Sequence, residues 1–346
     1  MSEETLDLLK ILSATPGPVG REGLVQDIVK EQFKQHCGSF VQDKIGNVVC
    51  TLEGGVDKHL AVVAHADEVG FLVSNIDDKG FLRVKWNTQG HIPDLRLLPG
   101  QWVLIMAENG FVPGVFCVQT AHIAGPKVKK RIPTYEEVFL DIGATSADQV
   151  KEQGINVGDP VIYAAPVEKL MDHIVAGKSM DDRIGLTILL KVLEHFSKIA
   201  KTKRPTITFV STVMEELGAK GAAAVARDLD VDEIIVLDIG LADDYPGTKG
   251  ESGISLGKGP VVVIKDNALH YSHELILRIV KIAEMEKIPI QRAVFHNYMT
   301  DGVQFASQGQ TVAVLAVPCR YSHSAFEAVN LLDVEMTIHL MMKLLS

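Results

Sequence analysis

The stretch Val210-Ser-Thr-Val-Met-Glu215-Glu216-Leu-Gly218 ends an apolar, β-branched run on two adjacent carboxylates and then a glycine. The apolar residues 207–213 are typical of a buried strand, and the alanine-rich residues 219–227 are typical of a helix. The two glutamates are therefore predicted to lie in a strand-to-helix turn. In open α/β sheets ligands bind at this end of the strands, although acids also occur in first helical turns simply because they complement the helix dipole.

Strand and helix patterns alternate on both sides of this turn. The apolar periodicity predicts helices over 4–14, 22–33, 184–196, 219–228 and 273–287 and from about 332, and strands over 39–42, 47–52, 59–64, 206–213, 233–237 and 311–317. Strands that alternate with helices indicate an α/β fold in which a mostly parallel mixed sheet is covered by helices.

Residues 69–167 have a different sequence pattern. Short alternating segments, separated by Gly, Pro, Asn and Asp turns, predict strands over 70–76, 81–86, 102–107 and 112–118, with one helix near 146–153. This pattern is typical of a small all-β domain. We therefore predict a discontinuous catalytic α/β domain, made of residues 1–68 and 168–346, interrupted by a β-rich domain of residues 69–167.

The composition restricts the classes of partner. The 346 residues are 47% hydrophobic, carry a formal net charge of -10 and show no basic patch, which argues against nucleic acids and membranes as partners. The acidic N-terminus and the lack of an apolar run of membrane-spanning length predict a cytoplasmic protein. Cys37, Cys50, Cys117 and Cys319 lack a Cys-x-x-Cys spacing, so we expect reduced thiols and no disulfide scaffold.

Acids and histidines gather at the predicted ends of the core strands and in the adjacent loops. The candidates are His65, Asp67, Asp181, Asp182, Glu215, Glu216, Asp238 and His323. Each residue alone has an ordinary structural explanation, as a helix cap, a turn residue or a buried histidine. Imidazole nitrogens and carboxylate oxygens are, however, the ligands that zinc, cobalt and manganese accept. Two histidines and three acids are enough for a pair of ions.

The remaining acids have roles that a two-metal hydrolase requires. Asp67 comes two positions after His65 and is placed to accept a hydrogen bond from the imidazole nitrogen that does not face the metal. A glutamate that is not a ligand can take a proton from a metal-bound water, whose pKa the metal lowers towards about 7. Spacing alone does not distinguish the ligand from the base within the pair Glu215 and Glu216.

Five motifs resemble those of the TET-type, tetrahedral di-metal aminopeptidases of bacteria and archaea, and the resemblance covers nearly the whole chain. The motifs are His65-Ala-Asp67-Glu-Val-Gly, Lys178-Ser-Met-Asp181-Asp182-Arg183-Ile-Gly, Glu215-Glu216-Leu-Gly, Leu237-Asp238 and Arg320-Tyr-Ser-His323-Ser. The resemblance implies a di-zinc exopeptidase-like core. It also implies two divalent ions per subunit, zinc first of all, with cobalt and manganese as alternatives.

The resemblance also assigns the ligands. It implies that His65 and Asp238 bind one ion, that Glu216 and His323 bind the other, and that Asp181 bridges the two.

The same resemblance assigns the supporting roles. It implies that Glu215 is the general base, that Asp67 orients His65, and that a cis peptide joins Asp181 to Asp182.

By the same resemblance, the protein would be an aminopeptidase that removes N-terminal residues from short peptides. The inserted β domain would mediate assembly into a homo-oligomer, a dodecamer built from dimers that encloses the active sites. Two segments depart from the family pattern: Met299-Thr-Asp301-Gly302, where relatives commonly carry Gly-Thr-Asp-Ala, and residues 239–247. Both departures bear on substrate preference and loop shape, because the five proposed ligands and the base are retained.

Two alternatives remain open. Two carboxylates that flank a bond can hydrolyse a glycoside without metal, which would make the protein an endoglucanase-like enzyme. The histidines argue against that chemistry. The other alternative is a peptide-binding scaffold without catalysis, since fold-level analogy alone does not establish function. The candidate ligand set shows no loss that would favour such a scaffold.

Overall fold

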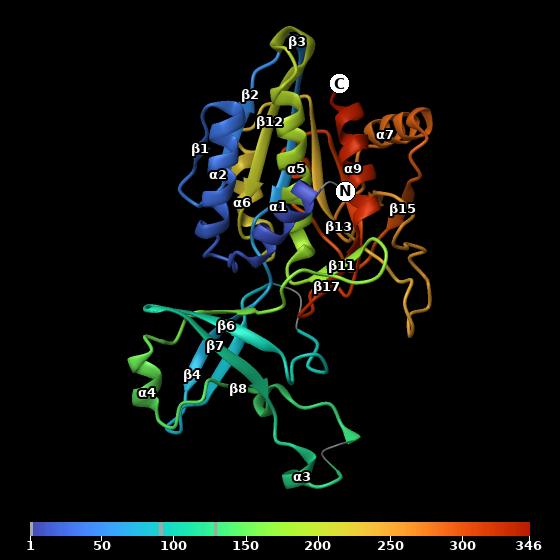
Figure 1. Ribbon diagram of the computed structural model, residues 1–346. Helices are drawn as coiled ribbons and strands as arrows, with labels where there is room; N and C mark the ends of the chain where they lie inside the picture. The colour runs from blue at the N-terminus through green and yellow to red at the C-terminus, as the bar shows by residue number, and fades with distance from the viewer. Residues whose placement is uncertain (1–2, 90–92, 128–129) are drawn as a thin grey trace.

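The computed structural model describes residues 3–89, 93–127 and 130–346, which form a helix-covered sheet and a smaller barrel of strands (Figure 1). Four parallel strands form the centre of the sheet, in the order β12 (Pro205–Thr212), β3 (Val56–His65), β13 (Glu233–Leu241) and β16 (Val312–Arg320). Their near-continuous burial explains the apolar runs in the sequence, because a parallel sheet is covered on both faces. The predicted α/β class is confirmed.

Antiparallel strands extend this centre on both sides. On one side lie β2 (Val48–Leu52) and β1 (Val41–Gln42), and on the other lie β17 (Glu327–Asn330), β11 (Ile174–Gly177) and β10 (Glu168–Lys169). A branch adds β14 (Val261–Lys265) and β15 (Gln291–Val294) beside β16. Strands β10, β11, β14, β15 and β17 were not predicted; they are two to five residues long, and periodicity is weak evidence for segments this short.

Helix α5 (Met180–Ser197) is the central helix, and it is buried along most of its length. It packs against β3 and β13 and lies between α1 (Glu3–Ala14) and α9 (Leu331–Leu344), as Figure 1 shows. Its first turn is irregular: the ψ angles of Asp181 and Asp182 are 106° and 40°, so the regular helix starts after them, as the predicted range 184–196 implies.

Further helices cover the rest of the sheet. They are α2 (Gly23–Cys37), α6 (Lys220–Ala226), α7 (His273–Glu286) and the unpredicted α8 (Gly302–Ser307). Helix α2 packs on β2 and α5, α7 packs on β14 and α9, and α6 packs on α8. Among the described residues no helix is long and apolar enough to cross a membrane.

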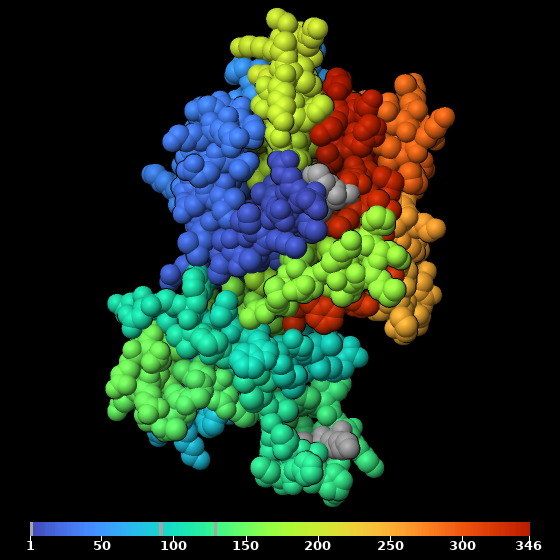
Figure 2. Space-filling view, viewed as in Figure 1, coloured from blue at the N-terminus to red at the C-terminus, as the bar shows by residue number. Residues whose placement is uncertain are grey.

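Six antiparallel strands close into a separate barrel with its own apolar core. In barrel order they are β4 (Phe71–Ile76), β5 (Leu82–Trp86), β8 (Phe139–Asp141), β7 (Gly110–Cys117), β6 (Trp102–Ala107) and β9 (Pro160–Tyr163). The same part of the chain contains two short helices, α3 (Ala121–Ala124) and α4 (Ala147–Glu152). Inside, the rings of Phe71 and Phe116 pack edge to face, with their centroids 5.0 Å apart. The small all-β domain predicted from the sequence is confirmed, and Figure 2 shows it against one end of the α/β part.

Candidate active site

Asp181 lies between two histidines that come from distant parts of the chain. Nε2 of His65 is 3.0 Å from Oδ1 of Asp181, and Nε2 of His323 is 3.3 Å from its Oδ2. The same His323 nitrogen is 3.1 Å from Oε1 of Glu216. One ligand atom from each of His65, Asp181 and Glu216 lies within 4.8 Å of the other two. Four of the five predicted ligands therefore form one connected group.

The backbone explains how these side chains meet. His65 is the last residue of β3 and lies directly opposite Thr212, the last residue of β12, so the turn that carries Glu216 follows beside it. Asp181 enters from the irregular start of α5, where the peptide bond to Asp182 is cis, as predicted. His323 lies in the loop after β16 with a φ of 61°. Parallel strands thus deliver their carboxyl ends to one site.

Asp238, the fifth predicted ligand, lies on the central strand β13 and is 4% exposed. The sequence analysis placed it just after a strand ending at residue 237, but β13 continues to Leu241, so Asp238 is inside the strand. Its pKa is raised well above the ordinary value, first because of burial and then because of the carboxylates of Asp181 and Asp182. Asp238 therefore belongs electrostatically to the same group.

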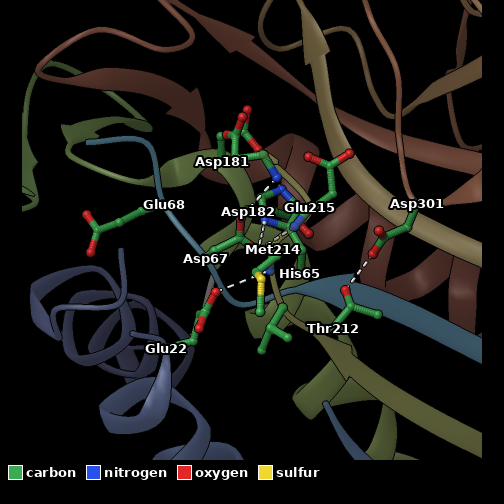
Figure 3. Close-up of polar contacts among 12 residues, drawn as sticks. Glu22, His65, Asp67, Glu68, Asp181, Asp182, Thr212, Met214, Glu215 and Asp301 are labelled. Atoms are coloured by element: carbon green, nitrogen blue, oxygen red, sulfur yellow. Dashed lines mark hydrogen bonds and ion pairs between the residues drawn. The ribbon is translucent and has the colours of Figure 1, made fainter. Parts of the chain in front are cut away.

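Asp67 has a role that the sequence did not suggest. Its two oxygens accept hydrogen bonds from the backbone N–H groups of Glu215, at 2.9 Å, and Glu216, at 3.0 Å. Oδ1 of Asp67 also lies 3.5 Å from Nδ1 of His65, which is long for a hydrogen bond. Figure 3 shows Asp67, His65 and Glu215 together in the middle of the group of labelled residues. Asp67 therefore fixes the turn of the two glutamates, and its action on His65 stays a prediction.

Burial and charge act together on Glu215. Its pKa is raised well above the ordinary value, first by burial and also by the carboxylates of Asp301, Glu216 and Asp238, while His65 opposes that rise. Oε1 of Glu215 has no hydrogen-bond partner among the described residues. A buried carboxylate without a donor is costly unless a cation, a proton or a substrate group satisfies it.

The neighbouring acids raise the pKa of both histidines. Burial alone lowers the pKa of His65, but its contacts with Asp181 and Asp67 outweigh burial and raise the pKa well above its ordinary value. His323 behaves alike: burial lowers its pKa, and Glu216 and Asp181 raise it further than burial lowers it. Burial raises the pKa of Asp181, but its bonds to the two histidines outweigh that effect and lower it. A dense set of imidazoles and carboxylates, in which one oxygen has no hydrogen bond to any residue that the structure describes, fits divalent cations.

A buried network of charged side chains lies next to the site. Nζ of Lys178 lies 2.6 Å from Oε2 of Glu68, and Nη2 of Arg183 lies 3.4 Å from Oε1 of Glu68. Arg183 is fully buried and also donates to the carbonyl of Leu12 at the end of α1. These three charged residues lie within the motifs of the sequence, but no role was predicted for them. Their adjacency to His65 and Asp181 in sequence was the available signal.

The barrel also reaches the site. The backbone N–H of Gln89, in the segment after β5, donates a 2.8 Å hydrogen bond to the carbonyl of Glu216. A small hollow lies between the two parts and is lined by Val69, Gly70, Phe71, Thr88, Pro93, Tyr163 and His323. The insert therefore touches the backbone of a predicted ligand, a contact that sequence patterns do not reveal.

Comparison with protein families now bears on this geometry. Residues 46–340 match the family model described as M42 glutamyl aminopeptidase, which covers most of the chain. The chain belongs to the M42 family. Every residue from His65 to His323 of the candidate site falls inside the matched range. M42 membership makes the chain a hydrolase of an aminopeptidase family.

Individual M42 relatives and solved structures agree with this assignment. The chain is 29% identical to the lysyl aminopeptidase of Pyrococcus furiosus, with 98% of this chain and 96% of the relative covered. The TET aminopeptidase of Thaumarchaeota archaeon SCGC AB-539-E09 superposes with a TM-score of 0.93 at 30% identity, covering 99% and 96% of the two chains. The Pyrococcus horikoshii TET1 peptidase, which can assemble into a tetrahedron or a large octahedral shell, gives 0.87 at 28% identity, covering 99% of each. The resemblance to TET-type aminopeptidases is confirmed.

Proposed function

We propose that this protein is a metal-dependent aminopeptidase that removes N-terminal residues from short peptides by means of two divalent ions. The observation that carries the proposal is the position of Asp181, whose two oxygens face His65 and His323 separately. A carboxylate that presents one oxygen to each of two imidazoles would be able to serve as a ligand to both cations of a two-metal hydrolase. The M42 assignment and the aminopeptidase relatives support the same activity.

The ligands divide into two sets around Asp181. His65 and Asp238 would hold one ion, and Glu216 and His323 would hold the other. The 3.1 Å approach of His323 to Glu216 supports the second set. Zinc is the first candidate, and cobalt and manganese accept the same ligands.

Glu215 is the proposed general base. When bound, the ions would lower the pKa of a water molecule and polarise the scissile carbonyl. Oε1 of Glu215 is buried and has no hydrogen-bond partner in the described part of the chain, so it is available to accept a proton from the attacking water and to pass it to the leaving amine. Asp67 holds the backbone of Glu215 in place for both transfers through its hydrogen bond to the N–H.

The insert is the proposed assembly domain. Large apolar side chains lie exposed on the barrel, including Trp102, which is 65% exposed, and Phe111, which is 49% exposed. Exposed apolar side chains of this size are typical of protein interfaces. The assembly of TET1 supports a homo-oligomer, and we propose a dodecamer built from dimers. Light scattering of the purified protein tests this, and a monomer at micromolar concentration would contradict it.

Metal analysis combined with a substrate panel tests the proposed reaction. Purified protein is loaded with zinc or cobalt, and its metal content is measured together with its activity on aminoacyl-nitroanilides, with and without a chelator. We expect about two ions per chain and an activity that the chelator abolishes. Fewer than about one ion per chain would count against the two-metal site. Activity on β-glucans that survives the chelator would favour the glycoside hydrolase alternative instead.

A further inference from the structure

Glu327, the first residue of β17, connects two segments of the candidate site. Its Oε2 accepts a 3.0 Å hydrogen bond from the backbone N–H of Asp181, and its Oε1 accepts a 2.8 Å hydrogen bond from the backbone N–H of His323. Asp181 and Glu327 are 146 positions apart in the chain. Glu327 is 1% exposed, and its bond to Asp181 is buried, whereas its bond to His323 is partly buried. One buried carboxylate thus joins the backbones of two proposed ligands.

Glu327 itself is fixed by strand pairing on both sides. It lies opposite Gly177 in β11, and the next residue, Ala328, lies opposite Arg320 in β16. Strand β11 leads directly into the irregular turn that carries Asp181. The Glu327 backbone is therefore held by the sheet, and its side chain transmits that fixed position to the two segments it contacts.

The segment that carries His323 needs such support. Tyr321 and His323 have φ angles of 65° and 61°, in the left-handed region that residues other than glycine adopt at a cost. The hydrogen bond to Glu327 satisfies the N–H of His323 in this conformation. Loss of that acceptor would remove one of the interactions that hold the segment in this conformation.

We propose that Glu327 is a positioning residue for the proposed metal pair, and this inference rests on the proposed function. It holds the backbones of Asp181 and His323 at the separation that lets their side chains share an ion. It does not need to touch the metal, because each of its oxygens already accepts a backbone N–H group. The ion assigned to Glu216 and His323 depends on both Glu327 contacts, whereas the ion assigned to His65 and Asp238 depends only on the contact to Asp181.

Replacing Glu327 with glutamine removes half of this arrangement without changing its size. An amide group offers one acceptor oxygen, and its NH₂ group would face the second backbone N–H donor. One hydrogen bond is therefore lost, and the NH₂ group of the glutamine and a backbone N–H group face each other as two donors. Loss of a partner that orients metal ligands typically weakens metal binding about 10- to 100-fold.

The chain offers a matched control at Asp333 on α9. This buried carboxylate also accepts two backbone N–H groups, from Gly257 at 2.6 Å and Gly259 at 2.7 Å. Neither glycine is a proposed ligand. Asp333→Asn therefore makes the same chemical change in the same kind of double contact. It measures how much stability is lost when such a carboxylate loses one hydrogen bond.

The experiment compares Glu327→Gln, Asp333→Asn and the parent in three measurements: stepwise affinities for zinc and cobalt by competition with a chelator, the visible spectrum of the cobalt-loaded protein, and the unfolding midpoint. We expect Glu327→Gln to weaken the binding of one ion about 10- to 100-fold more than that of the other, and to alter the cobalt spectrum. Asp333→Asn should lower the unfolding midpoint and leave both affinities and the spectrum unchanged.

Two outcomes would overturn the inference: parent affinities in Glu327→Gln, or an equal loss of affinity in both variants, which would show that affinity merely follows stability. If Glu327→Gln does not fold, Glu327→Ala, which removes the carboxylate without setting an NH₂ group against a backbone N–H donor, replaces it in the same comparison. A parent that binds fewer than about one ion per chain contradicts the proposed function itself, and that result is obtained before any variant is measured.

Discussion

The Asp67 carboxylate accepts a 2.9 Å hydrogen bond from the backbone N–H of Glu215, although 148 positions separate the two residues. The bond joins the segment after β3 to the turn after β12, the central neighbouring strands of the sheet. Asp67 is fully buried, so the bond is not exchanged for one to water. The position of the proposed base therefore depends on a carboxylate that comes from another strand.

Asp67→Asn should reduce turnover about 10- to 100-fold, the usual effect of losing a partner that orients a metal site. The amide can accept only one of the two N–H groups of Glu215 and Glu216. Steady-state kinetics on aminoacyl-nitroanilides measure the effect. Asp77→Asn is the control, because Asp77 accepts two backbone N–H groups, from Lys79 and Phe81, in the turn between β4 and β5 of the barrel. Full activity in Asp67→Asn would contradict this role.

Glu215→Gln should lower turnover about 10²- to 10⁴-fold and leave the number of bound ions unchanged. The reason is that the amide cannot accept a proton from water, while Glu215 is not assigned as a ligand. Elemental analysis of the same preparation gives the metal content. Retention of full activity, or loss of an ion together with activity, would show that Glu215 is not the base.

Asp181→Ala should lower the affinity for both ions, whereas His323→Ala should lower the affinity for one ion more than for the other. Asp181 has one oxygen facing each of the two histidines. Stepwise titration of metal-free protein with zinc distinguishes the two patterns. If Asp181→Ala retains one ion at parent affinity, the bridging assignment is wrong.

Glu22→Gln should change the dependence of stability on pH. Burial, and then the charge of Asp67, raise the pKa of Glu22 from 4.5 to about 7. Because the folded state binds this proton more tightly than the unfolded state, the stabilisation is complete below pH 4.5 and is lost as the pH rises through about 7. Glutamine lacks this ionisation, and its amide oxygen can still accept from the N–H groups of Gly20 and Met214, which both bond to Oε1 of Glu22.

The free energy of unfolding of Glu22→Gln minus that of the parent should therefore be larger at pH 8 than at pH 5, by up to about 3 kcal/mol. Denaturant unfolding of both proteins at both pH values, at one protein concentration, measures this difference. A difference in the free energy of unfolding that does not vary with pH would show that Glu22 does not titrate in this range.

The sequence by itself determined the fold class, the all-β character of the insert and the residue types of the site. These features are local: apolar periodicity reports which faces of a strand or helix are buried, and the acids and histidines lie at the ends of such segments. The two glutamates after residue 213 were placed in a strand-to-helix turn for this reason, and β12 does end at Thr212, with α6 beginning at Lys220.

Only the tertiary structure decided which of these groups meet. The order of the parallel strands brings His65 and Thr212 to the same height, and the irregular start of α5 puts Asp181 between His65 and His323. Glu327 was missed because it lies on a strand of four residues, too short to show periodicity, and because its partners are backbone N–H groups of other segments. Contacts between residues more than a hundred positions apart follow from strand order and loop conformation, which no local pattern in the sequence records.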